Sequence, residues 1–280
     1  MKKILIANRG EIAIRIARTC NDLGIKTVGI FSEDDINSLH LSKMDESFMI
    51  DEKGASAYLN IKKIIAVAKQ EKVDGIHPGY GFLSENPAFA KAAKQARLKF
   101  IGPSEKSLTI FGDKSEAKKL ALKLDIPVVR GTQGKTSLKQ ASSFFKDLKK
   151  NSSIVIKAIA GGGGRGMRVV DLESDLKDAM SRASSEAKSA FDSSDLYVEE
   201  YLKNYRHVEI QVLGDGKGQA THMHERECST QRRHQKIIEI APAPGIKKEL
   251  KEKMFDASIA LIKSSKYEGL ATVEFLVNYA

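Results

Sequence analysis

Residues 153–170 decide the fold of the second half of the chain, and they run Ser153-Ile154-Val155-Ile156-Lys157-Ala158-Ile159-Ala160-Gly161-Gly162-Gly163-Gly164-Arg165-Gly166-Met167-Arg168-Val169-Val170. Residues typical of strands stand on both sides of the glycines, so they predict two strands joined by a glycine loop. The loop contains the spacing G-x-G-x-x-G, but a dinucleotide-binding site requires that motif between a strand and a helix. Because a strand follows here, this order of elements argues against a dinucleotide-binding site.

The glycine loop has the features of a flap that covers phosphate groups. Glycines let backbone N–H groups approach phosphates, and their flexibility lets a loop close and exclude water. Lys157 on the incoming strand supplies a cation, and four consecutive glycines cost more backbone entropy than an ordinary turn needs. Protein kinases carry such a flap, but no H-R-D or D-F-G motif follows this one. We therefore expect a phosphate-covering loop in an enzyme other than a protein kinase.

A second glycine-containing segment, Gly131-Thr132-Gln133-Gly134-Lys135-Thr136, imitates a P-loop. The P-loop spacing requires a glycine five positions before Gly134, and Val129 occupies that position. We predict a surface loop there, without a phosphate site.

The first part of the chain alternates strands and helices in the order of a parallel sheet. An apolar strand at Ile4–Ala7 leads through Asn8-Arg9-Gly10 into an amphipathic helix, and a second strand follows at Thr27–Phe31. The alternation continues with helix Ile61–Gln70, strand Val73–Ile76, helix Pro87–Arg97 and strand Lys99–Ile101. We expect residues 1–112 to form a doubly wound α/β domain, whose ligands gather at the carboxyl ends of the strands.

Residues 113–280 mix helices with strands in hairpins, which is typical of an α+β domain. We expect a mobile lid subdomain at about 131–203 and a C-terminal part at 204–280. The expected helices are Lys114–Leu124, Ser137–Lys149, Glu173–Ala190 and Lys248–Lys263. The expected strands are Ile126–Val129, Ser153–Ala158, Met167–Val170, Leu196–Tyr201, the hairpin strands His207–Leu213 and Gln219–Glu225, and Ala271–Val277.

Length and composition exclude several classes of protein. The 280 residues are 41% hydrophobic and 29% charged, which is typical of globular domains and not of a disordered chain. No run approaches the ~18 apolar residues of a membrane helix, and Ile4–Ala7 is shorter than the roughly 7–15 apolar residues of a secretory signal. Cys20 and Cys228 are too far apart in the sequence for a Cys-x-x-Cys pair. We expect a soluble cytoplasmic protein without membrane contact.

The net charge favours an anionic partner. Lys and Arg number 46 against 36 Asp and Glu, which gives a formal charge of +10. However, the lysines are spread over helix faces, the chain has no Trp, and no basic stretch is interleaved with aromatic residues. A small-anion site therefore explains the charge better than nucleic-acid binding, which we do not expect.

Several polar residues near the C-terminal end are placed for chemistry. His222 and His224 share a strand face, but no further ligand has a convincing spacing for a metal. The segment Gln231-Arg232-Arg233-His234-Gln235-Lys236 gathers cations into a basic cradle, which would bring two anions together beside a phosphate flap. Glu274 interrupts an alternating strand, and we expect it on the core-facing side, where a carboxylate needs a cation or a metal. The backbone of Val198–Leu202 would hold an adenine only if it crosses between subdomains, which the residues alone leave open.

Taken together, these residues resemble the biotin carboxylase family, the ATP-grasp component of biotin-dependent carboxylases. The resemblance runs along the whole chain and rests on long unbroken signatures. They are Ile4–Ala13, His77–Asn86, Phe111–Lys114, the glycine loop, Arg206–Val212 and Glu225–Pro244. The resemblance implies a Rossmann-like N-terminal domain followed by an ATP-grasp domain with a glycine-rich flap.

The resemblance also implies a ligase that uses ATP and bicarbonate to form carboxyphosphate, and that carries carbon dioxide to N1 of biotin. Its cofactors would be ATP with magnesium or manganese, and biotin would be a carrier-bound substrate. Its partners would be a biotin carboxyl carrier domain and a carboxyltransferase component, with a homodimer as an open possibility. The implied ATP-binding residues are Lys114, Lys157, Gly163, Gly164, Glu199, Glu200, Tyr201, Leu202, His207, Gln231 and His234. Lys236 would hold bicarbonate as the catalytic residue, Glu274 would bind the metal, and Tyr80 would face biotin.

The end of the chain departs from the family pattern. The chain stops at Val277-Asn278-Tyr279-Ala280, whereas the family continues into a strand with a second magnesium carboxylate and a catalytic arginine. We therefore expect a C-terminally truncated part of a longer carboxylase that binds ATP weakly and does not complete the reaction. Two alternatives stay open: another ATP-grasp ligase that forms an acyl phosphate, such as one resembling carbamoyl-phosphate synthetase, and a non-catalytic nucleotide-binding module. The final carboxyl acceptor, whether pyruvate, acetyl-CoA or another acyl-CoA, does not follow from the sequence.

Overall fold

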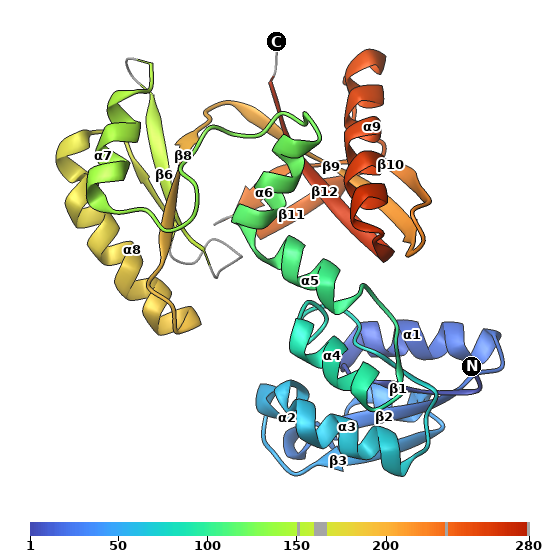
Figure 1. Ribbon diagram of the computed structural model, residues 1–280. Helices are drawn as coiled ribbons and strands as arrows, with labels where there is room; N and C mark the ends of the chain where they lie inside the picture. Colours follow the sequence, from blue (N-terminus) through green and yellow to red (C-terminus); the bar gives the residue numbers. More distant parts are fainter. Residues whose placement is uncertain (150–151, 160–166, 233–234, 279–280) are drawn as a thin grey trace. The chain divides into compact units, whose positions relative to one another are not determined.

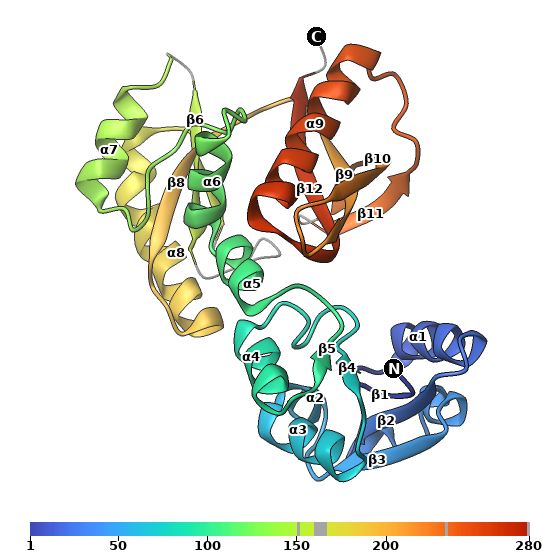
Figure 2. The ribbon, with the colours of Figure 1, turned by 45° about the vertical axis from the view of Figure 1, so that its right-hand side comes forward.

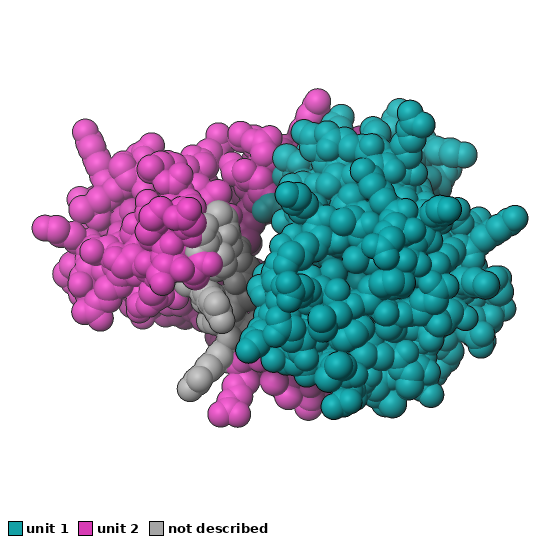
Figure 3. Space-filling model, turned by 90° about the horizontal axis from the view of Figure 1, so that it is seen from below, with its two compact units in different colours: residues 1–112, 214–219, 265–270 teal, residues 113–213, 220–264, 271–280 magenta. Residues whose placement is uncertain are grey.

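The computed structural model describes residues 1–149, 152–159, 167–232 and 235–278. The chain divides into two compact units, coloured separately in Figure 3. Unit 1 comprises residues 1–112 together with the short segments 214–219 and 265–270. Unit 2 comprises residues 113–213, 220–264 and 271–280. Among the described residues, no helix combines the length and apolar character needed to span a bilayer.

Unit 1 is built on a five-stranded sheet in which neighbouring strands are parallel, in the order β3-β2-β1-β4-β5. The strands are β1 (Lys3–Ile6), β2 (Lys26–Ser32), β3 (Glu46–Ile50), β4 (Gly75–His77) and β5 (Lys99–Phe100). The helices are α1 (Gly10–Asp22), α2 (Ala55–Leu59), α3 (Ile61–Gln70), α4 (Pro87–Gln95) and α5 (Glu105–Gly112), with 3₁₀ turns η1 (Glu33–Asp35) and η2 (Leu39–Lys43). This arrangement confirms the predicted doubly wound parallel sheet.

Alternation along β1 places helices on both faces of this sheet (Figure 1). Ile4 and Ile6 pack against the apolar side of α1, including Ile16 and Cys20. Leu5, between them, points to the opposite face and joins a second core with residues of α3 and α4, such as Ile64 and Phe89. Because both faces of the sheet are covered at β1, this strand carries three apolar residues in succession, Ile4, Leu5 and Ile6, instead of alternating with polar ones.

A capping signal in the sequence marks the start of α4. Asn86 accepts a hydrogen bond from the N–H of Phe89, with Pro87 in the first turn, as the Asn-Pro pair predicts. The helix ends at Gln95 rather than at the expected Arg97, because Arg97 adopts a left-handed conformation with φ of 60°.

A half-buried carboxylate, Asp35, organises the carboxyl end of β2. Asp35 accepts hydrogen bonds from Tyr58 Oη at 2.7 Å, from Arg9 Nη1 at 3.0 Å, and from the hydroxyls of Ser32 and Ser38 at 3.1 and 3.0 Å. Burial alone raises the pKa of Asp35, but these donors outweigh burial and lower the pKa to about 2. Burial and the neighbouring Asp35 in turn raise the pKa of Tyr58.

Unit 2 contains two sheets. The first has the order β7-β6-β8 and consists of β6 (Ser153–Ala158), β7 (Arg168–Val170) and β8 (Leu196–Tyr201). Both neighbours of β6 are antiparallel to it. Helices α7 (Leu138–Lys146) and α8 (Leu176–Phe191) lie on the same side of this sheet (Figures 1 and 2) and bury Ile154, Ile156 and Val198. Because side chains alternate along a strand, Lys157, Tyr197 and Glu199 point to the opposite face of the sheet.

The second sheet of unit 2 has the order β11-β10-β9-β12. Its strands are β9 (Tyr205–Asp215), β10 (Ala220–Arg232), β11 (Gln235–Ile240) and β12 (Glu268–Asn278). Helix α9 (Lys248–Ser265) contacts β10, because the Phe255 ring stacks on His222 and Lys251 Nζ lies 2.5 Å from Glu225 Oε1. Helix α6 (Lys114–Lys123) joins α9 and β12 in a small core that contains Ala121, Leu261 and Val273.

Several details of unit 2 differ from the sequence-based expectations, among them the end of the helix expected at Ser137–Lys149, which stops at Lys146. Ile126–Val129 is not a strand, because Pro127 has no N–H to donate and ladder bonding begins only at Arg130 and Gly131, which pair with β8. The helix expected from Glu173 starts as the 3₁₀ turn η3 (Glu173–Asp175). Strand β10 runs to Arg232, and β11 follows it as an antiparallel partner that the sequence did not predict.

A pH titration of stability tests the Asp35 network. Because the folded-state pKa of about 2 lies below the ordinary value of 3.8, Asp35 stabilises the fold above pH 3.8 and loses this contribution as the pH falls. Between pH 6 and pH 3, the wild type should lose about 1 kcal/mol of unfolding free energy that Asp35→Asn does not lose. Urea unfolding at the two pH values measures the difference. Asp22→Asn, which changes an exposed carboxylate of α1, is the matched control, and equal losses in wild type and Asp35→Asn would contradict the prediction.

Candidate functional site

The first turns of α6 bring two lysines to one side of a cavity. The side chain of Asp113 caps the helix by accepting hydrogen bonds from the N–H groups of Ser115 at 2.8 Å and Glu116 at 3.2 Å. This cap fixes where the helix starts. Lys114 and Lys118 are four residues apart and therefore lie one above the other on the same helix face.

Lys157 and Glu199, on the three-stranded sheet, pair with each other and with Lys118 of the cavity wall. Lys157 is on β6 and Glu199 on β8, and both point away from α7 and α8. Lys157 Nζ lies 2.6 Å from Glu199 Oε2, and Lys118 Nζ lies 3.2 Å from Glu199 Oε1. The Glu199 side chain is only 13% exposed, so its carboxylate is shielded from water. The two ammonium groups of Lys118 and Lys157 share this carboxylate.

The electrostatics of this cluster follow from its excess of cations. Desolvation and the neighbouring Lys157 ammonium lower the pKa of Lys114, while Glu199 acts in the opposite direction. Burial, followed by the charge of Glu199, raises the pKa of the nearby Tyr197 phenol. The cluster of Lys114, Lys118, Lys157 and Glu199, which we call the lysine cluster, has three cationic side chains and one anionic one. Such a balance favours an anion with several charges.

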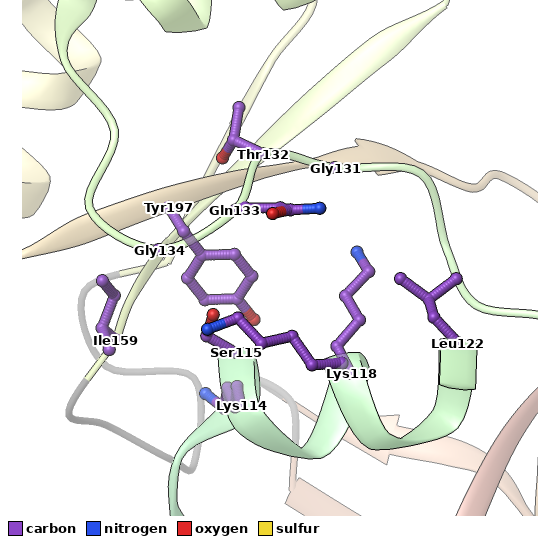
Figure 4. Close-up of a pocket in the computed structure, with 11 residues that line it drawn as sticks. Lys114, Ser115, Lys118, Leu122, Gly131, Thr132, Gln133, Gly134, Ile159 and Tyr197 are labelled. Carbon is purple, nitrogen blue, oxygen red and sulfur yellow. The ribbon is translucent and has the colours of Figure 1, made fainter. Parts of the chain in front are cut away.

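Figure 4 shows the cavity beside this cluster. Helix α6 supplies Lys114, Ser115 and Lys118, and the loop Gly131–Gly134 passes on the other side, with Tyr197 and Ile159 completing the wall. The cavity measures about 60 Å³, which is room for roughly two water molecules. The loop expected to be an ordinary surface turn therefore lines the cavity, although its sequence lacks the P-loop spacing.

A second cluster lies on the four-stranded sheet around Glu209. Lys236 on β11 donates to Glu209 Oε2 at 2.5 Å and also to Glu274 on β12. Arg226 on β10 pairs with Glu209 through one nitrogen and with Glu239 at 2.6 Å through the other. We call these five residues the Glu209 cluster. Glu209 is 1% exposed, so its charge depends on Lys236 and Arg226.

The protonation states in the Glu209 cluster are set by these pairs. Burial works against the charge of Lys236, but its hydrogen bonds to Glu209 and Glu274 raise the pKa well above the usual value. Burial likewise raises the pKa of Glu209, but Lys236 and Arg226 more than offset it, so the pKa is lowered overall. Lys236 is therefore a fixed cation at neutral pH.

The structure corrects the expected direction of Glu274. This side chain is 61% exposed and pairs with Lys236, so it does not lie on the core-facing side of β12. Val273 and Val277 occupy the inward positions, and Val273 packs into the core with Leu261 of α9. The predicted alternation of inward and outward side chains along β12 was correct. The sequence did not reveal which of the two faces of β12 is covered by α9.

Another group of potential metal ligands lies within this cluster. One ligand atom each from Glu209, Cys228 and Glu239 lies within 4.8 Å of the others. However, Arg226 pairs with both carboxylates. Burial and the nearby Glu209 also raise the pKa of Cys228 to about 11, which keeps the thiol protonated. The group is therefore better explained as part of the ion-pair network than as a metal site.

The remaining predicted site residues are distributed along the chain. Glu200 and Tyr201 lie on β8 and Leu202 follows it, while His207 is on β9 and Gln231 on β10. Tyr80 lies in unit 1, is 60% exposed, and accepts a hydrogen bond at its carbonyl oxygen from Asn8 Nδ2 at 2.8 Å. The predicted residues Gly163, Gly164 and His234 lie outside the described residues. Sequence reasoning missed Lys118, Gly131, Glu209 and Arg226, because only pairing across elements brings them to these clusters.

Comparison with known families identifies both parts of the chain. Residues 1–108 match the family described as "Biotin carboxylase, N-terminal domain". Residues 113–280 match "Carbamoyl-phosphate synthase L chain, ATP binding domain". The chain belongs to the biotin carboxylase family. This membership confirms the resemblance drawn from the sequence signatures, and it agrees with the parallel sheet followed by antiparallel strands in the chain.

Individual members of the family are similar to almost the whole length of this chain. The pyruvate carboxylase of Staphylococcus aureus is 49% identical over 280 residues, which are 99% of this chain and 24% of that protein. A biotin carboxylase from Campylobacter jejuni, solved as a β,γ-ATP complex, is 43% identical with a TM-score of 0.96, covering 99% of this chain and 62% of that one. The biotin carboxylase domain dimer of Hydrogenobacter thermophilus 2-oxoglutarate carboxylase, solved with MgADP, ADP and bicarbonate, is 39% identical with a TM-score of 0.95, covering 99% and 61%. The chain thus spans about a quarter of the length of the curated relatives it matches.

Removing the Glu209 charge should make Lys236 easier to deprotonate. Glu209→Gln takes away one of the two carboxylates that raise the pKa of Lys236, so this pKa should fall by about one unit. Reductive ¹³C-methylation of lysines followed by an NMR pH titration measures it, with Lys236→Arg assigning the signal. Glu239→Gln removes a carboxylate that pairs with Arg226 and not with Lys236, and it serves as the control. An unchanged titration in Glu209→Gln would contradict the described pairing.

Proposed function

We propose that this chain provides the ATP-dependent carboxylation of biotin in a longer biotin-dependent carboxylase, with bicarbonate as the carbon source. The observation that carries the proposal is that unit 2 contains two ion-pair clusters: the lysine cluster, which has an excess of positive charge beside a cavity, and the Glu209 cluster, which holds Lys236 in its charged form. Relatives solved with ATP analogues, MgADP and bicarbonate support the same assignment. The match of residues 1–108 to a biotin carboxylase domain favours this function over carbamoyl-phosphate synthesis.

The lysine cluster is proposed to bind the ATP phosphates. Lys114 and Lys157 would contact phosphate oxygens, because Lys114 lines the cavity, the Lys157 ammonium is close enough to lower the pKa of Lys114, and the cluster has an excess of positive charge. The flap glycines, Gly163 and Gly164 among them, are proposed to cover the phosphates. The segment Glu199–Leu202 is proposed to hold the adenine, and His207, Gln231 and His234 are proposed to lie along the ribose and phosphate side.

Lys236 is proposed to hold bicarbonate. In the reaction, a bicarbonate oxygen attacks the γ-phosphorus, the bond from phosphorus to the ADP oxygen breaks, and carboxyphosphate forms. Two anions must approach each other for this step, so a permanently charged ammonium lowers their repulsion. Carboxyphosphate then releases carbon dioxide and phosphate, the phosphate accepts the N1 proton of biotin, and N1 attacks the carbon dioxide. Tyr80 is proposed to face the biotin.

Glu274 fits a role as a magnesium ligand in part. Magnesium bound to nucleotides usually takes one or two carboxylate oxygens, with phosphates and water as the other ligands. Glu274 is exposed and offers one such carboxylate. On binding the metal, this carboxylate would give up its ion pair with Lys236. Bound magnesium, or manganese in its place, neutralises phosphate charge during transfer.

The partners and location are part of the same proposal. A biotin carboxyl carrier domain would bring biotin, and a carboxyltransferase component would pass the carboxyl group to the final acceptor. The relatives act on different acceptors, pyruvate and 2-oxoglutarate, which suggests that this part of the enzyme does not select the acceptor. A homodimer is proposed by analogy with the Hydrogenobacter domain. The free thiols Cys20 and Cys228 fit the reducing cytoplasm.

MgATP binding tests the nucleotide part of the proposal. The wild-type chain should bind MgATP, and Lys157→Met should weaken this binding about tenfold or more, because a charged hydrogen bond to phosphate is lost. Isothermal titration calorimetry measures both affinities. Lys123→Met removes an exposed lysine of α6 and should bind like the wild type. Absence of MgATP binding by the wild type would refute the proposed function.

Bicarbonate binding tests the role of Lys236. In the presence of MgADP, the chain should broaden the ¹³C NMR signal of labelled bicarbonate, and Lys236→Met should abolish the broadening because the cation is gone. Lys123→Met should retain it. Equal broadening by the wild type and Lys236→Met would remove Lys236 from the bicarbonate site.

A further inference from the structure

Lys118 is the member of the lysine cluster for which the family resemblance gave no role. Its Nζ lies 3.2 Å from Glu199 Oε1, while Lys157 Nζ lies 2.6 Å from Oε2 of the same carboxylate. Each ammonium therefore occupies its own oxygen. The Lys118 side chain is 18% exposed and that of Lys157 is 28% exposed, so the Lys118 half of the arrangement is the more shielded.

The Lys118 half is also the more firmly held. Gly131 forms a bridge to Glu199, and a Cβ added there would lie 3.0 Å from both Lys118 Nζ and Glu199 Cγ, and 2.7 Å from the Val198 oxygen. The loop backbone thus packs directly against the pair. Hydrogen bonds on either side fix this contact, from Glu200 N to Arg130 O at 2.9 Å and from Thr132 N to Val198 O at 2.8 Å.

Phosphate binding would disturb the pair between Lys157 and Glu199. A phosphate that takes the Lys157 ammonium competes with Glu199 Oε2 for the same donor. If Lys157 were the only partner of Glu199, its departure would leave a shielded carboxylate without a cation, which is strongly unfavourable. Lys118 on Oε1 removes this difficulty, because Glu199 keeps one cation throughout.

We propose that Lys118 is a positioning residue that keeps Glu199 compensated, so that Lys157 is free to exchange this carboxylate for a nucleotide phosphate. The inference rests on the proposed ATP-binding function and adds a residue to it. Lys118 itself touches Glu199 and acts through it. Its effect should therefore depend on the phosphates of the ligand and on the charge of Glu199.

Calorimetric titration of the full 280-residue chain tests this role. Lys118→Met should raise the dissociation constant for MgATP about tenfold, as expected when a shielded carboxylate loses the second of the two cations paired with it. The same variant should bind adenosine with unchanged affinity, since adenosine has no phosphate to take Lys157 from Glu199. Lys118→Arg, which keeps the charge, should stay within about twofold of the wild type for MgATP.

A double-mutant cycle separates this role from simple packing. In a Glu199→Gln background no charge needs compensation, so adding Lys118→Met should change MgATP affinity by less than about threefold. Lys123→Met, one lysine lost from the exposed side of the same helix, controls for the change in net charge. Lys118→Gln replaces Lys118→Met in every comparison if circular dichroism shows that the methionine variant does not fold.

The outcomes distinguish this inference from the function on which it rests. A wild type that does not bind MgATP refutes both. A wild type that binds MgATP, with Lys118→Met binding equally well or losing adenosine and MgATP affinity alike, overturns only the role of Lys118. A loss for MgATP alone that disappears in the Glu199→Gln background supports it.

Discussion

A carboxylate withdrawn from water needs a cation beside it, and this requirement organises both clusters of unit 2. Glu199 meets it with Lys118 and Lys157, and Glu209 meets it with Lys236 and Arg226. In each case the carboxylate sits on one strand and its partners come from other elements. The ion pairs therefore tie together α6, β6 and β8 in one place, and β9, β10, β11 and β12 in the other. Each cluster also holds a lysine in place, Lys118 in the first and Lys236 in the second.

Charge pairing of this kind serves ligand binding as well as folding. An ammonium that already has a carboxylate partner is pre-positioned and loses little conformational entropy when an anionic ligand takes the carboxylate's place. The cost lies in the carboxylate that is left behind. Sharing one carboxylate between two cations reduces this cost, and both Glu199 and Glu209 are shared in this way.

Much of the fold was predictable because local patterns decide it. The strands Ser153–Ala158 and Leu196–Tyr201 have the predicted bounds, and the parallel order of unit 1 follows from its alternating elements. Ile126–Val129 has the composition of a strand, but Pro127 removes a donor that a ladder needs. The ion-pair partners of Glu209 depend on which strands are neighbours in the sheet. No local sequence pattern predicts the strand order β11-β10-β9-β12. Glu274 was assigned to the wrong face for the same reason, since the position of α9 decides which face is covered.

The chain returns to unit 1 twice after leaving it at residue 112, through residues 214–219 and 265–270. Three contacts fix these two segments. The N–H of Gly216 in the first segment donates a hydrogen bond to the Tyr267 carbonyl of the second at 3.0 Å. The second segment contacts residues 1–112 through the Tyr267 ring, which lies edge-on to Phe111, and through an ion pair between Glu268 and Lys99. Dividing the gene after codon 112 would therefore yield an N-terminal half that lacks pieces of its own surface. Subcloning by linear position would separate residues that belong to one folding unit.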